Sequence, residues 1–236
     1  MPMIFGLSDE LIFPPPYLAR EDGLLAIGGD LSVERLLLAY GQGIFPWYTE
    51  EDPILWWAPD PRLVLEPRLF HMPRRLARSI RQGQFQVTFD TSFAQVIRAC
   101  SAPRPGKEQG TWLVPEMIEA YIRLHEAGYA HSVECWRDGM LAGGLYGVAL
   151  GKIFFGESMF SRAANSSKVA LAHLVTLLRH WGFDLIDCQM TTSHLLSLGA
   201  REMPGYEFHR RLELHVCQPT RLGPWTEAAA LKNGRP

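Results

Sequence analysis

The sequence has few cysteines and no long apolar run, which argues against a metal site built on cysteine and against a membrane-spanning segment. Its four cysteines lie too far apart for any CxxC pattern, and its eight histidines form no HxH or HxxxH pair, so no metal site is expected. The cysteines are expected to be reduced thiols in a cytoplasmic protein. No stretch of eighteen apolar residues exists, so no membrane-spanning segment is predicted. The N-terminal segment lacks the basic and apolar parts of a secretory signal, which also favours the cytoplasm.

Lysine is scarce as well, because arginine outnumbers it by 19 to 4 in a chain of net charge −2. The planar guanidinium group suits phosphate binding. Four arginines crowd residues 73–82, which the pattern predicts to be a helix beginning at a proline. Three of them follow a spacing of i, i+4 and i+7, which indicates either a phosphate-binding stripe or a solvated helix face. The four arginines are Arg74, Arg75, Arg78 and Arg81.

The sequence divides near residue 62, which predicts a small N-terminal domain over 1–62 and a main domain over 63–236. Two aromatic blocks in the first part, residues 44–48 and 54–62, contain several prolines. Proline disfavours helices and central strands, so both blocks are predicted to be ordered loops. Their rings either fasten the small domain to the larger one or form a stacking platform for a nucleotide base.

Alternating strands and helices are predicted from residue 84 onward. The strands are expected at 84–89, 130–136, 141–150, 152–157 and 184–189, and the helices at 92–100, 114–127, 166–180 and 206–215. In the N-terminal part, Ser32 is expected to cap a short helix that ends at Gly41. Antiparallel strands followed by strand, helix and strand indicate a domain of the α+β or mixed α/β class with the fold of an acyltransferase.

Polar groups interrupt two of the apolar segments, one around Glu157 and the other at Asp187 and Gln189. In a regular strand Asp187 and Gln189 point to the same face. A buried carboxylate without a partner is costly, so the interruptions indicate either a satisfied core network or a functional site. Their occurrence in two neighbouring segments, together with the aromatic blocks, favours a site.

Several blocks of the sequence, in order from about residue 13 to 210, resemble the leucyl/phenylalanyl-tRNA–protein transferases. The resemblance implies a small N-terminal domain joined to a GNAT-like acyltransferase domain. It also implies transfer of leucine or phenylalanine, and of methionine, from aminoacyl-tRNA to proteins that begin with arginine or lysine, which marks them for degradation. The matching blocks lie at residues 44–48, 54–62, 110–112, 155–161, 185–189 and 197–200.

Two other functions stay open: a CoA-dependent N-acetyltransferase of the same fold class, and a tRNA-binding module without catalysis. A GNAT enzyme holds the CoA pyrophosphate on a glycine-rich turn at a helix N-terminus. The corresponding residues here, 161–167, contain no glycine, which counts against CoA. No cofactor is therefore expected, and the chain is expected to be a monomer.

The resemblance implies that Asp187 and Gln189 are the catalytic pair. The Gln189 carbonyl would hold the incoming amine, while Asp187 would orient Gln189 or draw the amine's proton, and the division of roles stays open. The resemblance also implies a ribose or acceptor contact for Glu157, and contacts of the four arginines to acceptor-stem phosphates.

Two further sets of residues are expected to bind substrate. An apolar pocket for the transferred side chain is expected from Leu145, Phe154, Met159, Leu174 and Ile186, for which plain core is the alternative. Contacts to the terminal adenosine or the substrate backbone are expected from Trp47, Trp112, Tyr40 and Tyr121. For the two tyrosines the alternative is again a place in the core.

Overall fold

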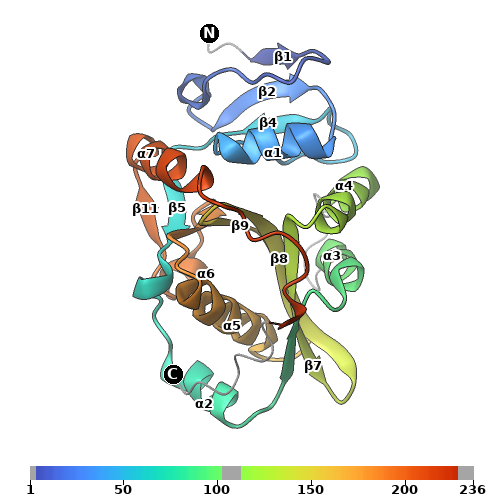
Figure 1. The fold of residues 1–236 in the computed structure, drawn as a ribbon, viewed down its shortest axis with the longest axis vertical. Coiled ribbons are helices and arrows are strands. Elements are labelled where there is room, and N and C mark those ends of the chain that lie inside the picture. Colours follow the sequence, from blue (N-terminus) through green and yellow to red (C-terminus); the bar gives the residue numbers. More distant parts are fainter. Residues whose placement is uncertain (1–3, 103–112, 228–236) are drawn as a thin grey trace.

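The computed structural model describes residues 4–102 and 113–227, and it contains two sheets (Figure 1). The smaller sheet has four strands in the order β1-β2-β4-β3 and carries helix α1 against it, at one end of the long axis. Its elements are β1 (Phe5–Leu7), β2 (Leu24–Gly28), α1 (Val33–Gly41), β3 (Phe45–Pro46) and β4 (Leu55–Trp57).

The larger sheet has seven strands in the order β11-β5-β10-β9-β8-β7-β6, of which β10 and β9 run parallel. Its strands are β5 (Arg62–Leu65), β6 (Gln86–Phe89), β7 (Ala130–Arg137), β8 (Met140–Leu150), β9 (Ile153–Ser161), β10 (Leu185–Gln189) and β11 (Arg201–Met203). The helices around it are α2 (Arg74–Arg81), α3 (Phe93–Ser101), α4 (Pro115–Glu126), α5 (Ser166–His180), α6 (Ser193–Leu196) and α7 (Gly205–Val216). Two short 3-10 helices, Pro16–Leu18 and Pro67–Leu69, complete the elements.

Two hydrophobic cores lie on opposite faces of the seven-stranded sheet, because successive side chains of a strand point to opposite faces. On β8, Leu145 packs into the core around α5, whereas the next residue, Tyr146, packs into the core shared by α3, α4 and the N-terminal elements. Phe154 and Phe155 on β9 divide in the same way. The buried face of α5 therefore covers one side of the sheet, and the small sheet with α1 covers part of the other.

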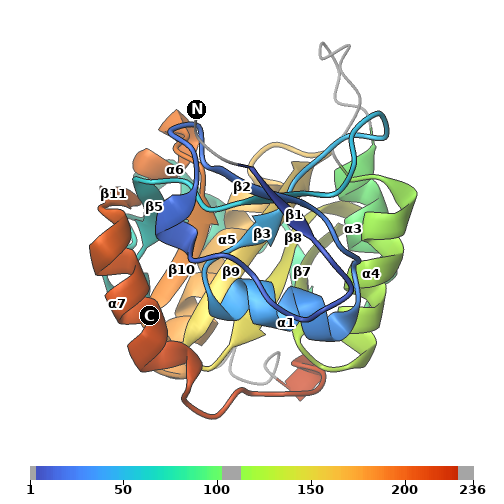
Figure 2. The same cartoon turned by 90° about the horizontal axis from the view of Figure 1, so that it is seen from above.

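The N-terminal elements pack directly on the large sheet. The ring of Tyr40 in α1 lies 5.0 Å from that of Phe155 in β9. Seen from above, β1, β2, β3 and α1 lie across strands β8 and β9 (Figure 2). The side chains of both parts form one continuous buried cluster.

The predicted mixed α/β architecture is confirmed, and so are the strands and helices predicted from residue 84 onward, within about two residues at most ends and four at the end of β9. Ser32 caps α1 as expected, since its hydroxyl accepts the backbone N–H of Arg35. Pro73 precedes α2.

The prediction of loops for both aromatic blocks is wrong in part. Leu55–Trp57 forms the strand β4, which lies between β2 and β3, and Phe45–Pro46 forms the edge strand β3. The prolines flank β4 rather than interrupt it, and the one inside β3 lies on an edge, where a missing donor is tolerated. Strands β2, β5 and β11 were not predicted.

Within residues 4–102 and 113–227, none of the helices has the length and apolar character needed to cross a membrane. The same residues contain no cluster of three His, Cys, Asp or Glu side chains arranged to bind a metal ion.

Candidate active site

A cavity of about 440 Å³ lies where β9 and β10 separate. The two strands pair only as far as Asp187 opposite Phe155, and β9 then continues alone on that side to Ser161. Residues of α5 and β3 close the cavity, and its volume lies in the range of small-molecule sites. Eight residues predicted for the site line it: Trp47, Leu145, Phe154, Glu157, Met159, Leu174, Ile186 and Gln189.

The apolar side of the cavity consists of side chains from β8, β9, β10 and α5. All five residues expected to hold the transferred side chain lie here, and four of them are almost fully buried. They belong to the same core as the buried face of α5, so the cavity is an opening in that core. Trp47 lies at the opening, 40% exposed, with its ring against Trp57.

Glu157 forms the polar end of the cavity. Its Oε1 accepts a hydrogen bond from Nε2 of Gln189 at 2.8 Å, and its Oε2 accepts one from the Tyr121 hydroxyl at 2.9 Å. The Tyr121 hydroxyl in turn bonds the Tyr40 hydroxyl at 2.5 Å. Four polar side chains from α1, α4, β9 and β10 thus form one hydrogen-bonded chain.

The pKa of Glu157 is raised to about 7, chiefly by burial and also by the nearby charge of Asp187. The hydrogen bonds from Tyr40, Tyr121 and Gln189 act in the opposite direction. Burial also raises the pKa values of both tyrosines well above their usual range. The tyrosines therefore remain neutral donors near pH 7, where Glu157 changes its charge.

Asp187 and Gln189 do not share a face, contrary to the strand prediction. The register of β10 shifts between them, and Gln189 adopts a φ of +61°. The Gln189 side chain reaches the cavity, whereas the fully buried Asp187 carboxylate accepts Nε and Nη2 of Arg62 at 2.8 and 2.7 Å. The sequence pattern did not reveal the bulge that breaks the alternation.

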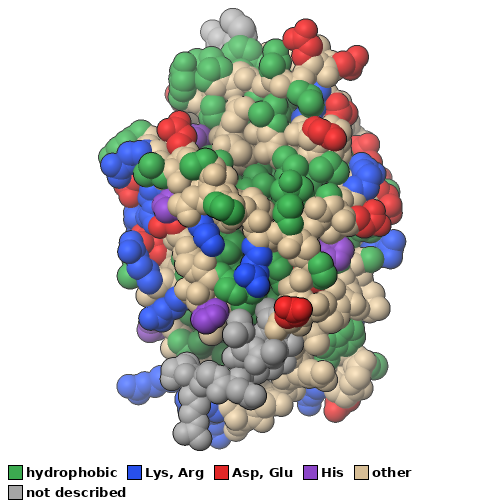
Figure 3. Space-filling view, viewed as in Figure 1, with side chains coloured by type: hydrophobic (Ala, Val, Ile, Leu, Met, Phe, Trp, Pro, Cys, Tyr) green, Lys and Arg blue, Asp and Glu red, His purple; other side chains and the backbone are tan. Residues whose placement is uncertain are grey.

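The other predicted residues that the structure describes do not line the cavity. Tyr40 and Tyr121 are fully buried behind Glu157, and Trp112 lies outside the described residues. The four arginines of α2 are exposed, and α2 packs on α5 through buried Leu76. Figure 3 shows Lys and Arg side chains on the surface over α2.

Sequence reasoning missed several residues of the cavity and its support. Arg62, the last residue of the aromatic block 54–62, was not predicted for the site, yet an arginine directly before the apolar residues 63–65 was a usable indication of a buried charge partner. Phe45 and Pro46 lie in the aromatic block 44–48 and Cys188 lies in the block 185–189, but none of the three was assigned to the cavity. The remaining ones have no distinctive sequence pattern, and they include Tyr146, Leu171, Met190, Thr192, His194 and Leu195.

A largely apolar cavity with a few convergent polar groups, one of them a carboxyl group of raised pKa, is the usual arrangement of an enzyme active site. The family model for the leucyl/phenylalanyl-tRNA protein transferase matches residues 64–213, and the model for its N-terminal domain matches residues 29–60. The chain therefore belongs to the leucyl/phenylalanyl-tRNA–protein transferase family.

Relatives of that name match almost the whole chain. The protein from Syntrophobacter fumaroxidans is 62% identical over 94% of this chain and 95% of its own length. The protein from Nitrosospira multiformis is 58% identical over 94% of this chain and 97% of its own length.

Two solved structures with a similar fold are much more distant in sequence. A GCN5-related N-acetyltransferase from Kribbella flavida has a TM-score of 0.37 and 11% identity, over 71% of this chain and 59% of its own. The L-PGS structure from Bacillus licheniformis has the same TM-score and identity, over 71% of this chain and 53% of its own. Similarity at this level supports no inference about the site.

Proposed function

We propose that this chain transfers leucine or phenylalanine from aminoacyl-tRNA to the α-amino group of a protein. The supporting observation is the cavity, whose wall is apolar and whose end presents the Gln189 amide and Glu157. The apolar wall suits a leucyl or phenylalanyl side chain, and the polar end suits the reacting ester and amine. Membership of a family named for this reaction supports the same conclusion.

The reaction is the aminolysis of an ester. The amine nitrogen forms a bond to the carbonyl carbon, the bond from that carbon to the ribose oxygen breaks, and a proton passes from the amine to that oxygen. With a pKa of about 7.7–8.0, roughly 10–15% of an α-amino group is neutral at pH 7, so supplying the neutral amine costs only about 1.2 kcal/mol. Orientation of two reactants contributes about 7–11 kcal/mol. The site therefore acts chiefly by positioning.

Gln189 is the residue that we assign to hold the amine. Its Nε2 is bonded to Glu157, which leaves the amide oxygen as the acceptor for the incoming amino group. Glu157, with its pKa of about 7, is half ionised near neutral pH and accepts hydrogen bonds when charged. We assign Asp187 to the site through its contact with the backbone of Gln189.

The apolar wall selects the transferred residue only weakly. A difference of one methylene in an apolar pocket is worth about 1–3 kcal/mol. Met159 lies in the wall and, being flexible, repacks around different guests. We therefore propose methionine as a third substrate beside leucine and phenylalanine.

The tRNA is bound by surfaces beyond the cavity. We assign Trp47 at the opening to the terminal adenosine, because an exposed ring stacks on a base. Trp112, outside the described residues, is assigned to the same contact through the family resemblance alone. The exposed arginines Arg74, Arg75, Arg78 and Arg81 are assigned to acceptor-stem phosphates. Such contacts bind the tRNA without reading its sequence.

We further propose that the acceptors are proteins with N-terminal arginine or lysine, destined for degradation. The enzyme is proposed to act as a monomer in the cytoplasm. We also propose that the two domains divide near residue 62, which separate family-model matches to residues 29–60 and 64–213 support.

The direct test is the transfer of radiolabelled leucine from charged tRNA to a protein that begins with arginine. An otherwise identical protein that begins with glycine is the control. Transfer to the first protein alone supports both the reaction and the acceptor rule. If charged tRNA binds and no leucine is transferred, the chain is a binding module, and transfer from acetyl-CoA instead would make it an N-acetyltransferase.

A further inference from the structure

Gln189 has a backbone conformation that few residues other than glycine adopt. Its φ is +61°, at the point where the pairing of β10 with β5 shifts register. The left-handed region is disfavoured for a residue with a Cβ atom. Contacts of the surrounding structure must therefore hold Gln189 in this conformation.

The Asp187 carboxylate provides such a contact. Its Oδ1 accepts the backbone N–H of Gln189 at 2.9 Å, which closes a turn of the kind that aspartate makes two residues along the chain. The same carboxylate accepts two hydrogen bonds from Arg62, at 2.8 and 2.7 Å. Asp187 is 0% and Arg62 2% exposed, so both charges lie away from water. A bidentate pair fixes the orientation of the carboxylate as well as its position.

Arg62 itself contacts two aromatic rings. The carbon of its guanidinium group lies 4.8 Å from the ring centre of Phe45 in β3 and 4.9 Å from that of Phe208 in α7. Phe45 also lines the cavity. The guanidinium group thus connects β3, α7 and β10 directly behind the cavity wall.

We propose that Arg62 is a positioning residue for the transfer reaction. Through the Asp187 carboxylate it holds the bend at Gln189, and the bend directs the Gln189 amide toward Glu157 and the cavity. This inference rests on the proposed function, since it concerns the same site. Arg62 does not line the cavity, so its effect on the reaction passes through Asp187 and Gln189.

The proposal gives Asp187 a role that differs from that of a proton acceptor. If its task is to accept the backbone N–H of Gln189, the carboxamide oxygen of an asparagine performs it too. If instead its task is to take the amine's proton, asparagine fails as completely as alanine does. The two roles are therefore separable by substitution.

The first experiment compares Arg62→Lys with the wild type. Lysine keeps the charge but cannot form the bidentate pair. We expect kcat for leucine transfer to fall about 100-fold, the loss typical of a misplaced reacting group, while KM for leucyl-tRNA is unchanged. If Arg62 contributed to stability alone, Arg62→Lys would lower the midpoint of unfolding, but the folded variant would keep the wild-type kcat.

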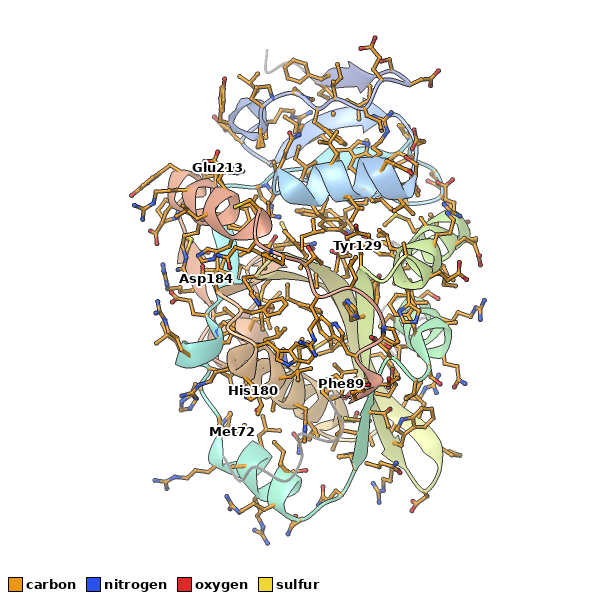
Figure 4. All side chains as sticks on the ribbon, viewed as in Figure 1. Met72, Phe89, Tyr129, His180, Asp184 and Glu213 are labelled. Atoms are coloured by element: carbon orange, nitrogen blue, oxygen red, sulfur yellow. The ribbon has the colours of Figure 1, made fainter. Side chains whose placement is uncertain are left out.

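Arg211→Lys is the matched control, because Arg211 forms the same bidentate pair with Asp184, at 2.8 and 2.7 Å. Figure 4 shows Asp184 beside α7, and neither residue lines the cavity. We expect this variant to keep the wild-type kcat. An Arg62→Lys variant with the same kcat as Arg211→Lys would overturn the proposal.

The second experiment removes both charges, which avoids leaving one buried and unpaired. Arg62→Gln is combined with either Asp187→Asn or Asp187→Ala. We expect the pair with asparagine to transfer leucine at least about tenfold faster than the pair with alanine, because only asparagine retains the acceptor for the Gln189 N–H. Equal rates would overturn the positioning role.

The wild-type rate separates this proposal from the proposed function. If the wild-type protein transfers no leucine, the proposed function fails and the positioning role fails with it. If the wild type transfers leucine and the two comparisons show no difference, only the positioning role is overturned.

Discussion

Nε2 of Gln189 donates a hydrogen bond to Oε1 of Glu157 across 2.8 Å, and this contact joins β10 to β9 at the point where the two strands have separated. The cavity begins at that separation, so its polar end consists of side chains from both strands. Tyr121 and Tyr40 extend the contact to α4 and α1. The N-terminal elements are thereby coupled to the reacting end of the cavity.

The raised pKa of Glu157 predicts how stability depends on pH. The folded-state pKa is about 7 and the usual value is 4.5, so between these pH values the folded protein holds a proton that the unfolded chain releases. The contribution of Glu157 is therefore fully present below pH 4.5 and is lost as pH rises through about 7. Urea unfolding of the wild type and of Glu157→Gln at several pH values measures this contribution. From pH 4.5 to 7, we expect the free energy of unfolding of the wild type to fall by at most about 3 kcal/mol relative to that of the variant.

Glu66 is the control of opposite sign. Burial raises its pKa, but hydrogen bonds from Arg68, Arg211 and Arg201 outweigh this and lower the pKa to about 2. Its contribution is present above pH 4.5 and is lost as the pH falls toward 2, so the stability of a Glu66→Gln variant differs from that of the wild type above pH 4.5 and the difference shrinks in acid. A flat difference between Glu157→Gln and the wild type from pH 4.5 to 7 would contradict the assigned environment of Glu157.

The apolar wall predicts a change of substrate preference on enlargement. Leu174 and Leu178 lie on α5 and are both buried, but only Leu174 lines the cavity. Either residue changed to alanine is expected to destabilise the protein by about 2–5 kcal/mol. Only Leu174→Ala is expected to shift the ratio of phenylalanine to leucine transfer, by about tenfold in favour of the larger residue. Competition between the two charged tRNAs measures the ratio, and an equal shift in both variants would contradict the pocket assignment.

The basic face of α2 predicts a salt-dependent affinity for tRNA. Replacement of Arg74, Arg78 and Arg81 by glutamine is expected to weaken binding and to reduce the dependence of log K on log salt by about 1 per arginine that contacts a phosphate. Arg210, exposed on α7, is the control for the loss of one positive charge. Filter binding at several salt concentrations gives both slopes, and an unchanged slope in the α2 variant would remove α2 from the tRNA surface.

Trp225, in the C-terminal segment, does not line the cavity, so its replacement is expected to lower stability and to leave activity unchanged. The buried Trp225 ring stacks on His131 at 3.6 Å, and its backbone N–H donates to Asp90 at 2.7 Å. Trp225→Ala is expected to lower the free energy of unfolding by about 3–5 kcal/mol. None of these residues lines the cavity, so leucine transfer at a temperature where the variant is folded should remain at the wild-type rate. A lost rate in the folded variant would show that this contact supports the site.

Much of the fold follows from sequence pattern. The strands and helices from residue 84 onward have regular apolar periods, and alternation along β8 divides Leu145 and Tyr146 correctly between the two faces of the sheet. Short strands without such a period, such as β4 and β11, were missed. Their stability comes from pairing with strands distant in the sequence rather than from local preference.

The candidate site was predictable where it consists of apolar strand residues and was not where the backbone departs from regularity. The five apolar residues expected to hold the transferred side chain all line the cavity. The bulge at Gln189 was not foreseeable, because it depends on a hydrogen bond that the Gln189 backbone N–H donates to the Asp187 carboxylate and on the charge of Arg62, which is 125 positions away from Asp187 in the sequence. An arginine and an aspartate so far apart give no local pattern.

The most direct test of the account is single-turnover transfer of leucine from leucyl-tRNA by the Gln189→Ala variant, with leucyl-tRNA affinity measured on the same preparation. Gln84→Ala, an exposed position that does not line the cavity, is the matched control. We expect Gln189→Ala to transfer leucine at a rate lower by about 100-fold or more, because the amine loses its acceptor. Its affinity for leucyl-tRNA should be unchanged, and Gln84→Ala should keep the wild-type rate. A Gln189→Ala variant that transfers leucine as fast as Gln84→Ala would contradict the account.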